Sequence, residues 1–346
     1  MSLGKKKILS QGAAGGVVGT DNFNTVIWSN GVGQHQSPIT GVGFQPDFVW
    51  IKMRNAGQNH VLTDSVRGAT KTLESNTEDF EETVAQGLTA FNADGFALGN
   101  DSRFNHDERS GVAWCWYAPT AESISASGSR LASTIKKNVA SGFSIVKYTG
   151  TGSAATVGHG LSSAEMYIVK SMEHSASWYT YHIGLDSSAP QDYNVRLNET
   201  AARQDSSSYW NDTAPTNSVF NIGTTTGVSK NNTDFIAYCF HSVAGYQKVG
   251  SYTGNRPSNV TVYTDSNGDG TGTGGFQPRF VMIKADANGE DWTIVDSTRG
   301  NFALYPNSSA SEDAYTGVTF NSTGFVVGNS GLVNTSGANH IYLAIA

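Results

Sequence analysis

Two acidic residues recur with an arginine three positions later, in two related segments of the chain. Asp64 precedes Arg67 and Asp296 precedes Arg299, each within the string Asp-Ser-x-Arg-Gly. A carboxylate beside a guanidinium could act as an acid next to an electrophile, or it could be an ion pair that fixes a turn. Because the pair recurs, each time directly before a glycine, we interpret it as a structural turn and predict no catalytic residues.

A second set of residues combines aromatic rings with polar groups. Trp178, Tyr181 and His182 lie in one short run, in which His182 replaces the recurrent Asp. Aromatic faces can cover the apolar face of a pyranose while polar edges bond its hydroxyl groups, but the same run also fits a buried strand, and both interpretations stay open. Tyr209 and Trp210, in a loop rich in Ser and Asp, are the better candidates for an exposed glycan contact.

A third segment resembles the start of a calcium-binding loop. Asp265, Asn267 and Asp269 place oxygen atoms at alternate positions. The twelfth position is Phe276, where such a loop needs a bidentate Glu, so a plain Asn-Gly and Asp-Gly turn is favoured. With no Walker loop, nucleophile elbow, His-x-x-x-His or Cys-x-x-Cys motif, the sequence predicts no enzyme, no metal and no cofactor.

The chain repeats one segment three times. Gly43–Lys52 reads GFQPDFVWIK, Gly275–Lys284 reads GFQPRFVMIK, and Gly160–Lys170 is a more divergent copy. The lysines that end these segments are 118 and 114 residues apart, which is the length of a small domain. The equivalent strands near the repeat ends carry Cys115 and Cys239, which we therefore expect to be separate buried thiols and not a disulfide.

The pattern around these segments is that of short strands. Four consecutive apolar residues, Phe48 to Ile51, predict a strand covered on both faces. Asp-Gly and Thr-Gly before Phe96 and Phe325 predict hairpins. The position of Asn30, which is Gly150 and Gly254 in the other copies, is predicted to need a left-handed turn, and Glu78 to Glu82 could form one helical turn.

The expected fold class is all-β, with three tandem antiparallel β-sandwich domains of jelly-roll or lectin-like type. The predicted divisions are an N-terminal arm (1–21), repeat 1 (22–119), a linker or added strand (120–141), repeat 2 (142–243) and repeat 3 (244–346).

Composition limits the partners of the protein. Charged residues make up 15% of the 346 residues, Gly numbers 39 and the formal net charge is −7, which argues against a protein that binds nucleic acid by neutralising phosphates. No apolar run is long enough to cross a bilayer, and no apolar secretion signal follows the basic start, so we expect synthesis in a cytoplasm and no membrane insertion.

The repeated string GFQPDFVWIK, the following Asp-Ser-x-Arg-Gly and the closing Ala-Trp-Cys-Trp resemble an uncharacterised repeat family. That family is common in virion and tail-fibre proteins of tailed bacteriophages, especially marine ones, and the resemblance covers roughly residues 22–346. It implies a virion component, made in the host cytoplasm, that contacts other virion proteins and further copies of itself. It brings no set of catalytic residues.

From these observations we expect a structural protein of a phage tail or tail fibre with contact to a host-surface glycan. A capsid decoration or head-fibre protein is the first alternative, since it would share the fold and differ only in position. A glycan depolymerase is the second; it needs two carboxylates across a cleft, and no recurrent acidic pair is present.

Overall fold

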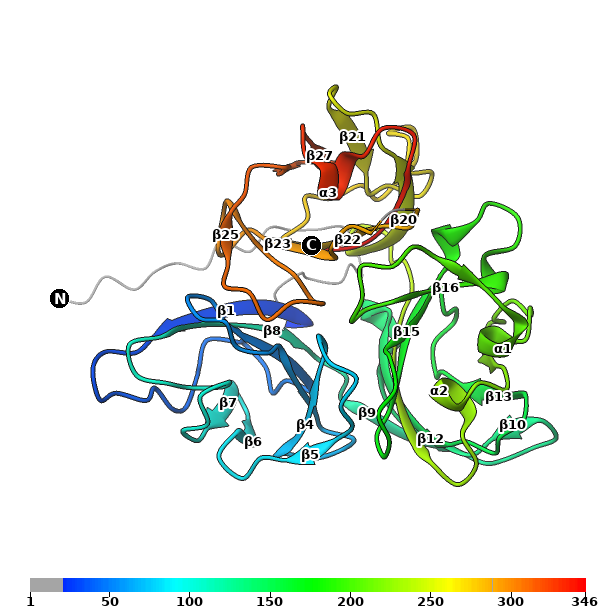
Figure 1. Ribbon diagram of the computed structural model, residues 1–346, viewed down its shortest axis with the longest axis horizontal. Coiled ribbons are helices and arrows are strands. Elements are labelled where there is room, and N and C mark those ends of the chain that lie inside the picture. Colours follow the sequence, from blue (N-terminus) through cyan, green and yellow to red (C-terminus); the bar gives the residue numbers. More distant parts are fainter. Residues whose placement is uncertain (1–20, 288) are drawn as a thin grey trace.

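The computed structural model describes residues 21–287 and 289–346, which consist almost entirely of strands and turns (Figure 1). The predicted arm of residues 1–21 lies outside the described residues except for Asp21. Repeat 1 contains β1 (Phe23–Ser29), β2 (Phe48–Met53), β3 (Val61–Asp64), β4 (Lys71–Glu74), β5 (Glu82–Thr83), β6 (Leu88–Asn92), β7 (Gly95–Leu98) and β8 (Ser110–Trp116).

Residues 120–141 are not an unstructured linker. They contain β9 (Thr120–Ile124), β10 (Arg130–Leu131), β11 (Ser133–Asn138) and the 3-10 turn η2 (Val139–Ser141). Repeat 2 continues with β12 (Phe143–Thr149), β13 (Ala155–Gly158), β14 (Met166–Ser171), β15 (Tyr179–His182), η3 (Ile183–Leu185), η4 (Pro190–Asp192), β16 (Tyr193–Arg196), β17 (Gln204–Asp205), α1 (Ser207–Trp210), β18 (Val219–Ile222), α2 (Thr226–Ser229) and β19 (Asp234–Phe240).

Among the described residues, repeat 3 has no counterpart of β9 to β11. It contains β20 (Gln247–Thr253), β21 (Val260–Tyr263), β22 (Phe280–Ala285), β23 (Thr293–Asp296), β24 (Phe302–Leu304), β25 (Asp313–Ala314), β26 (Val318–Asn321), β27 (Gly324–Val327), α3 (Gly331–Asn334) and β28 (Asn339–Ile345). The three α-helices found in the described part of the chain have four residues each, so the fold is all-β, as the sequence predicts.

Three large sheets share one strand order. In repeat 1 it is β1-β8-β2-β3-β4-β5, and in repeat 3 it is β20-β28-β22-β23-β24-β25. Repeat 2 has β12-β19-β14-β15-β16-β17 in the same arrangement, with β11 and β9 added beyond β12. All pairings among the described strands are antiparallel except that of β10 with β13. The segment between repeats 1 and 2 therefore widens the second sheet.

Each large sheet packs one face against a smaller sheet of its own repeat. The small sheets are β6-β7, β10-β13-β18 and β21-β27-β26, and an apolar cluster fills each sandwich. Cys115 and Cys239 belong to two of these clusters and are free, buried thiols, as expected. Burial raises the pKa of both thiols, that of Cys239 to about 12, so they serve as small apolar residues.

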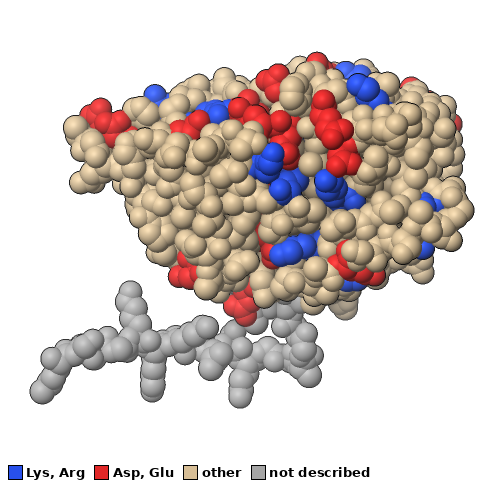
Figure 2. Space-filling model, turned by 90° about the horizontal axis from the view of Figure 1, so that it is seen from below, with Lys and Arg blue, Asp and Glu red and all other residues tan. Residues whose placement is uncertain are grey.

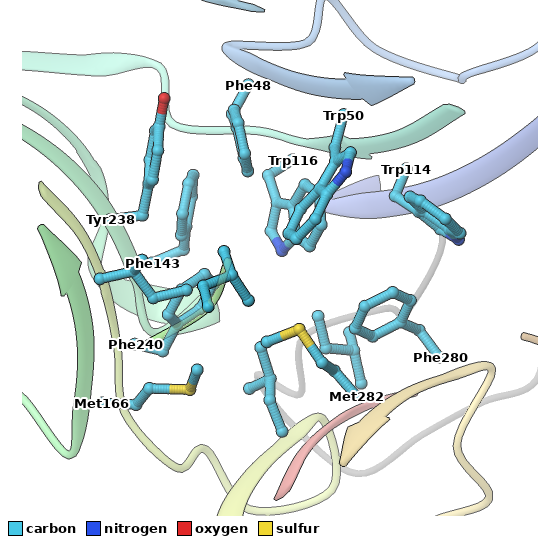
Figure 3. Packing of buried hydrophobic residues seen from close by; sticks show 14 of the residues in the cluster. Phe48, Trp50, Trp114, Trp116, Phe143, Met166, Tyr238, Phe240, Phe280 and Met282 are labelled. Atoms are coloured by element: carbon cyan, nitrogen blue, oxygen red, sulfur yellow. The ribbon is translucent and has the colours of Figure 1, made fainter. Parts of the chain in front are cut away.

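The opposite faces of the three large sheets meet in one shared core. Every residue of the central strands β2, β14 and β22 is buried, because alternate side chains point to the two faces. Figure 3 shows side chains from all three repeats converging, among them Trp50, Trp116, Phe143 and Phe280. Phe48 of repeat 1 stacks on Tyr238 of repeat 2 at 4.2 Å between ring centres. The repeats thus do not sit side by side as separate beads.

Two local expectations are wrong. Asn30, Gly150 and Gly254 do not adopt a positive φ. Glycine is needed at the latter two positions because a Cβ would lie 2.6 Å from the Lys230 carbonyl and 2.2 Å from the Thr335 carbonyl. The residues from Glu78 to Glu82 form no helical turn but lead as a loop into β5.

The start of β1 and the last residue of the chain lie against the same side chain. Arg279 donates from Nη2 to the carbonyl of Phe23 at 3.2 Å and to the carbonyl of Ala346 at 2.8 Å. The Phe23 ring also packs edge-on against Phe280, so the first and third repeats are in direct contact.

Candidate functional site

The Asp-Ser-x-Arg-Gly segments form buried corners after β3 and β23. In repeat 1, Asp64 Oδ1 accepts from the backbone N–H groups of Val66 and Arg67, and Oδ2 accepts from Arg67 Nε. Both side chains are fully buried. Although burial alone would lower it, the Asp64 carboxylate raises the pKa of Arg67 above its usual value. Asp296 and Arg299 repeat this arrangement, with Nε 2.6 Å from Oδ2.

Each of these corners also binds a side chain of another repeat. Tyr238 of repeat 2 donates its hydroxyl to Asp64 at 2.8 Å, and Trp114 of repeat 1 donates its Nε1–H to Asp296 at 3.0 Å. Trp114 and Tyr238 occupy equivalent places on the last strands β8 and β19, opposite Thr25 and Ile145. The acidic corners are therefore contacts between repeats as well as turns.

Repeat 2 makes the same contact with different chemistry. His182 stands at the position of Asp64, and Leu185 stands at that of Arg67. His182 Nδ1 accepts from the Gly184 N–H at 2.9 Å, which leaves the proton on Nε2 to be donated to the Tyr342 carbonyl of repeat 3 at 3.1 Å. Burial lowers the pKa of His182 to about 4, so the imidazole is neutral near pH 7. Repeat 3 offers a carbonyl here because its residue equivalent to Trp114 is Leu343, which has no donor.

Backbone hydrogen bonds also join each repeat to the next one, outside the shared core. Glu81 N–H donates to the Met172 carbonyl, Arg203 N–H to Asp286, and Glu312 N–H to Arg54. In each case the donor directly precedes β5, β17 or β25, and the acceptor follows the lysine of the central strand by two residues. Repeat 1 thus bonds to repeat 2, repeat 2 to repeat 3, and repeat 3 back to repeat 1. The three repeats therefore form a closed ring. We call the three equivalent interfaces between repeats seams, and the interface of repeat 1 with repeat 2 the first seam.

The three recurrent lysines are buried at these seams. Lys170 donates from Nζ to the Glu78 carbonyl of repeat 1 at 2.8 Å, and Lys284 donates to the Thr200 carbonyl of repeat 2 at 3.3 Å. Lys52 donates to the carbonyls of Met53 and Ala56, both at 2.8 Å. Burial lowers the pKa of each lysine to about 8. Their positive ends bind loop carbonyl groups and are not presented to a substrate.

The residues predicted to contact a glycan lie in the interior. Tyr209 is 9% exposed, and Trp178, Tyr181, His182 and Trp210 are at most 1% exposed. Trp178 donates its Nε1–H to the Glu74 carbonyl at the first seam, and Trp210 donates to the Tyr193 carbonyl beneath β16. With both ring faces covered, these side chains do not form the exposed sugar platform that the sequence suggested.

The loop with calcium-like spacing is held by its own backbone. Asp265 accepts from the N–H groups of Gly268 and Gly272, at 2.5 and 2.8 Å. Asp269 accepts from both the N–H and the hydroxyl of Thr271, and Asn267 donates to that same hydroxyl. The carboxylates are thus used as turn acceptors. Within residues 21–287 and 289–346, no three His, Cys, Asp or Glu side chains are grouped to hold a metal ion.

Repeat 1 carries a groove beside its contact with repeat 2 that the sequence analysis missed. It has a volume of about 310 Å³ and is lined by Thr72, Glu74, Asp79, Phe80, Glu82 and Arg103. Phe80 is 52% exposed, which is unusual for this side chain. The signal that could have revealed it is an isolated phenylalanine among acids in the most variable part of the repeat.

Charge is distributed without a dominant sign on the visible surface. Figure 2 shows a face on which acidic and basic side chains stand next to one another, with wide uncharged areas around them. Around the groove, Arg103 forms ion pairs with Glu74, Asp101 and Glu82. In the part of the chain that the structure describes, no helix has the length and apolar character needed to span a bilayer.

Comparison with known proteins gives one family. No curated protein and no solved structure matches the chain. A family model described as a domain of unknown function, DUF7483, matches residues 18–346, which include all three repeats. By this match over nearly its whole length, the chain belongs to the DUF7483 family.

Proposed function

We propose that the chain is a structural component of a bacteriophage virion, located in a tail or tail fibre and in contact with a host-surface glycan. The observation that carries the proposal is the set of contacts made by the recurrent residues. The corner acids, the central-strand lysines and the backbone donors before β5, β17 and β25 all bind across seams or close turns. What has been kept in the three copies is the shape of a rigid body.

The sequence resemblance supports the same proposal independently. The repeated GFQP strings and the Asp-Ser-x-Arg-Gly segments resemble those of virion and tail-fibre proteins of tailed phages. A body with a shared core and closed seams suits a part that must keep its shape under load. Contact with partners then falls to loops and exposed edges, such as the two-residue strands β5, β17 and β25.

The proposal is tested on virions of the phage that encodes the chain. Purified particles are labelled with an antibody raised against residues 22–346 and imaged by negative-stain electron microscopy. We expect label on the tail or its fibres. Label on the head would instead support a capsid decoration or head-fibre protein, and unlabelled particles whose proteins lack the chain in mass spectra would refute a virion role.

A further inference from the structure

Phe80 is exposed but rigidly held. On one side, the Glu78 carbonyl accepts from Lys170 Nζ at 2.8 Å and from the Ala176 N–H at 3.0 Å. On the other side, the Glu81 N–H donates to the Met172 carbonyl at 3.2 Å. Three hydrogen bonds across the first seam therefore fix the backbone around the ring. A ligand that packs on this ring does not have to order a loosely held loop.

The fold does not require a phenyl group at this position. Glu81, Arg203 and Glu312 make the equivalent backbone bonds at the three seams, so the residues before them are equivalent. These residues are Phe80, Ala202 and Ser311. Two of the three seams close with a methyl or a hydroxymethyl group. An exposed ring at the remaining seam calls for a role other than folding.

A fixed polar frame surrounds the ring. Arg103 pairs with Asp101 and Glu74 at 3.0 and 2.9 Å, and with Glu82. The Glu82 side chain stays 47% exposed, so its oxygen atoms can also accept from a ligand. Thr72, which is 1% exposed, lines the groove, and its Oγ1 has no hydrogen-bond partner among the described residues. The groove is thus lined by a threonine whose buried hydroxyl lacks a partner, beside an ordered guanidinium and carboxylates.

We propose that this groove binds a non-acidic pyranose unit of a glycan, with its C–H face on the Phe80 ring. An apolar face beside a rim of hydroxyl groups matches one exposed ring next to carboxylate acceptors. Among the residues that line the groove, the acids Glu74, Asp79 and Glu82 outnumber the cation Arg103, so an acidic sugar would be repelled. This assignment deepens the glycan contact of the proposed function and rests on it for the surface that displays the sugar.

The test is saturation-transfer NMR on the purified full chain. The probes are the methyl glycosides of glucose, galactose, mannose and N-acetylglucosamine, each alone, with glucuronic acid as the charged comparison. We expect transfer to the ring protons of at least one neutral probe and none to glucuronic acid. Phe80→Ala should weaken that binding roughly 2- to 10-fold, as for the loss of one aromatic contact, whereas Phe80→Trp should retain it.

Two matched variants distinguish a specific site from non-specific binding to an exposed aromatic ring. Ile183→Ala, which removes another exposed apolar side chain, should leave transfer unchanged. Ser311→Phe, which places a phenyl group at an equivalent seam, should create no second site. The proposal is overturned if no neutral probe receives transfer, if Phe80→Ala binds like the parent, or if light scattering shows that Phe80→Ala dissociates an oligomer. Because the measurement uses isolated protein, its failure leaves the virion-labelling result standing, and the reverse holds too.

Discussion

Asp64 and His182 occupy equivalent corners and use opposite hydrogen-bonding chemistry. Asp64 accepts from the Tyr238 hydroxyl and is neutralised by Arg67, whereas His182 donates to a carbonyl and stands beside Leu185. The acid and arginine therefore belong together as a set, as do the imidazole and leucine. A mixed set leaves a buried charge without its partner.

Arg67→Leu should lower the free energy of unfolding by about 3–5 kcal/mol, because the Asp64 carboxylate stays buried without its cation. The double variant Asp64→His with Arg67→Leu copies the corner of repeat 2 and should recover much of that loss. Urea denaturation of the parent, both single variants and the double variant measures the coupling. A double variant no more stable than Arg67→Leu would contradict the exchange of sets.

The buried lysines predict a rise of stability at mildly alkaline pH. Lys52, Lys170 and Lys284 have a pKa of about 8 when folded, below the ordinary 10.5. Between pH 8 and 10 the unfolded chain therefore binds more protons than the folded one. The free energy of unfolding should rise with pH in this window, by up to about 1.4 kcal/mol per pH unit and lysine. Buried tyrosines, whose pKa is raised, reverse the trend above this window.

Urea denaturation at pH 7, 8, 9 and 10 checks this slope. Lys170→Met should make it shallower, whatever its effect at pH 7, while Lys230→Met at an exposed position should not change it. A slope that is flat or negative in the parent would show that the three amines stay charged in the fold.

At the residue scale, the sequence identified the structurally important positions but not the residues that they contact. Recurrence marked Asp64, Arg67, Asp296 and Arg299 as turn residues, and the structure places all four in buried turns. Their partners Tyr238 and Trp114 are 174 and 182 residues away, and no local pattern encodes such a distance. Loop composition misled for Trp210 because the short helix α1 turns its ring inward, where its N–H finds a carbonyl.

At the element scale, the hairpins between β6 and β7 and between β26 and β27 depend on their first glycine. Gly95 has a φ of 116°, and a Cβ there would lie 2.1 Å from the Ile39 carbonyl oxygen. A Cβ at Gly324 would likewise lie 2.0 Å from the Val262 carbonyl oxygen. The sequence identified both turns from Asp-Gly and Thr-Gly, but the close approach of a third strand segment was not visible in it.

Gly95→Ala and Gly324→Ala should each lower the free energy of unfolding by more than about 1 kcal/mol, because the new methyl group meets backbone. Thermal and urea denaturation measure the loss. Gly57→Ala is the control: its Cβ would be 3.8 Å from the Ser309 carbonyl, and its effect should stay within about 0.5 kcal/mol. Equal effects at Gly95 and Gly57 would mean that the hairpin backbone yields easily.

At the scale of the whole molecule, the sequence revealed the period of the repeat but not that the three repeats share one core. Four consecutive apolar residues, Phe48 to Ile51, predicted a central strand covered on both faces, and β2 and its counterparts β14 and β22 are buried throughout. What covers the second face is the other two repeats, through the shared core. A sequence pattern reports that a face is buried but does not report by what.

The shared core predicts that the three repeats unfold together. Trp292 lies in the core and donates its Nε1–H to the Arg196 carbonyl of repeat 2. Trp292→Ala should cost about 3–5 kcal/mol and weaken amide protection in all three repeats by a similar factor. Hydrogen exchange followed by mass spectrometry reads each repeat separately. Loss of protection confined to residues 244–346 would show that the repeats are independent domains.

Arg279 holds the start of β1 and residue 346 next to each other. Since one guanidinium clasps the carbonyls of Phe23 and Ala346, polypeptide joined to either side would leave from the same spot. By the same geometry, a circularly permuted chain should keep the original fold. In this permutant, a short peptide joins the two ends, and new termini are made in a surface loop.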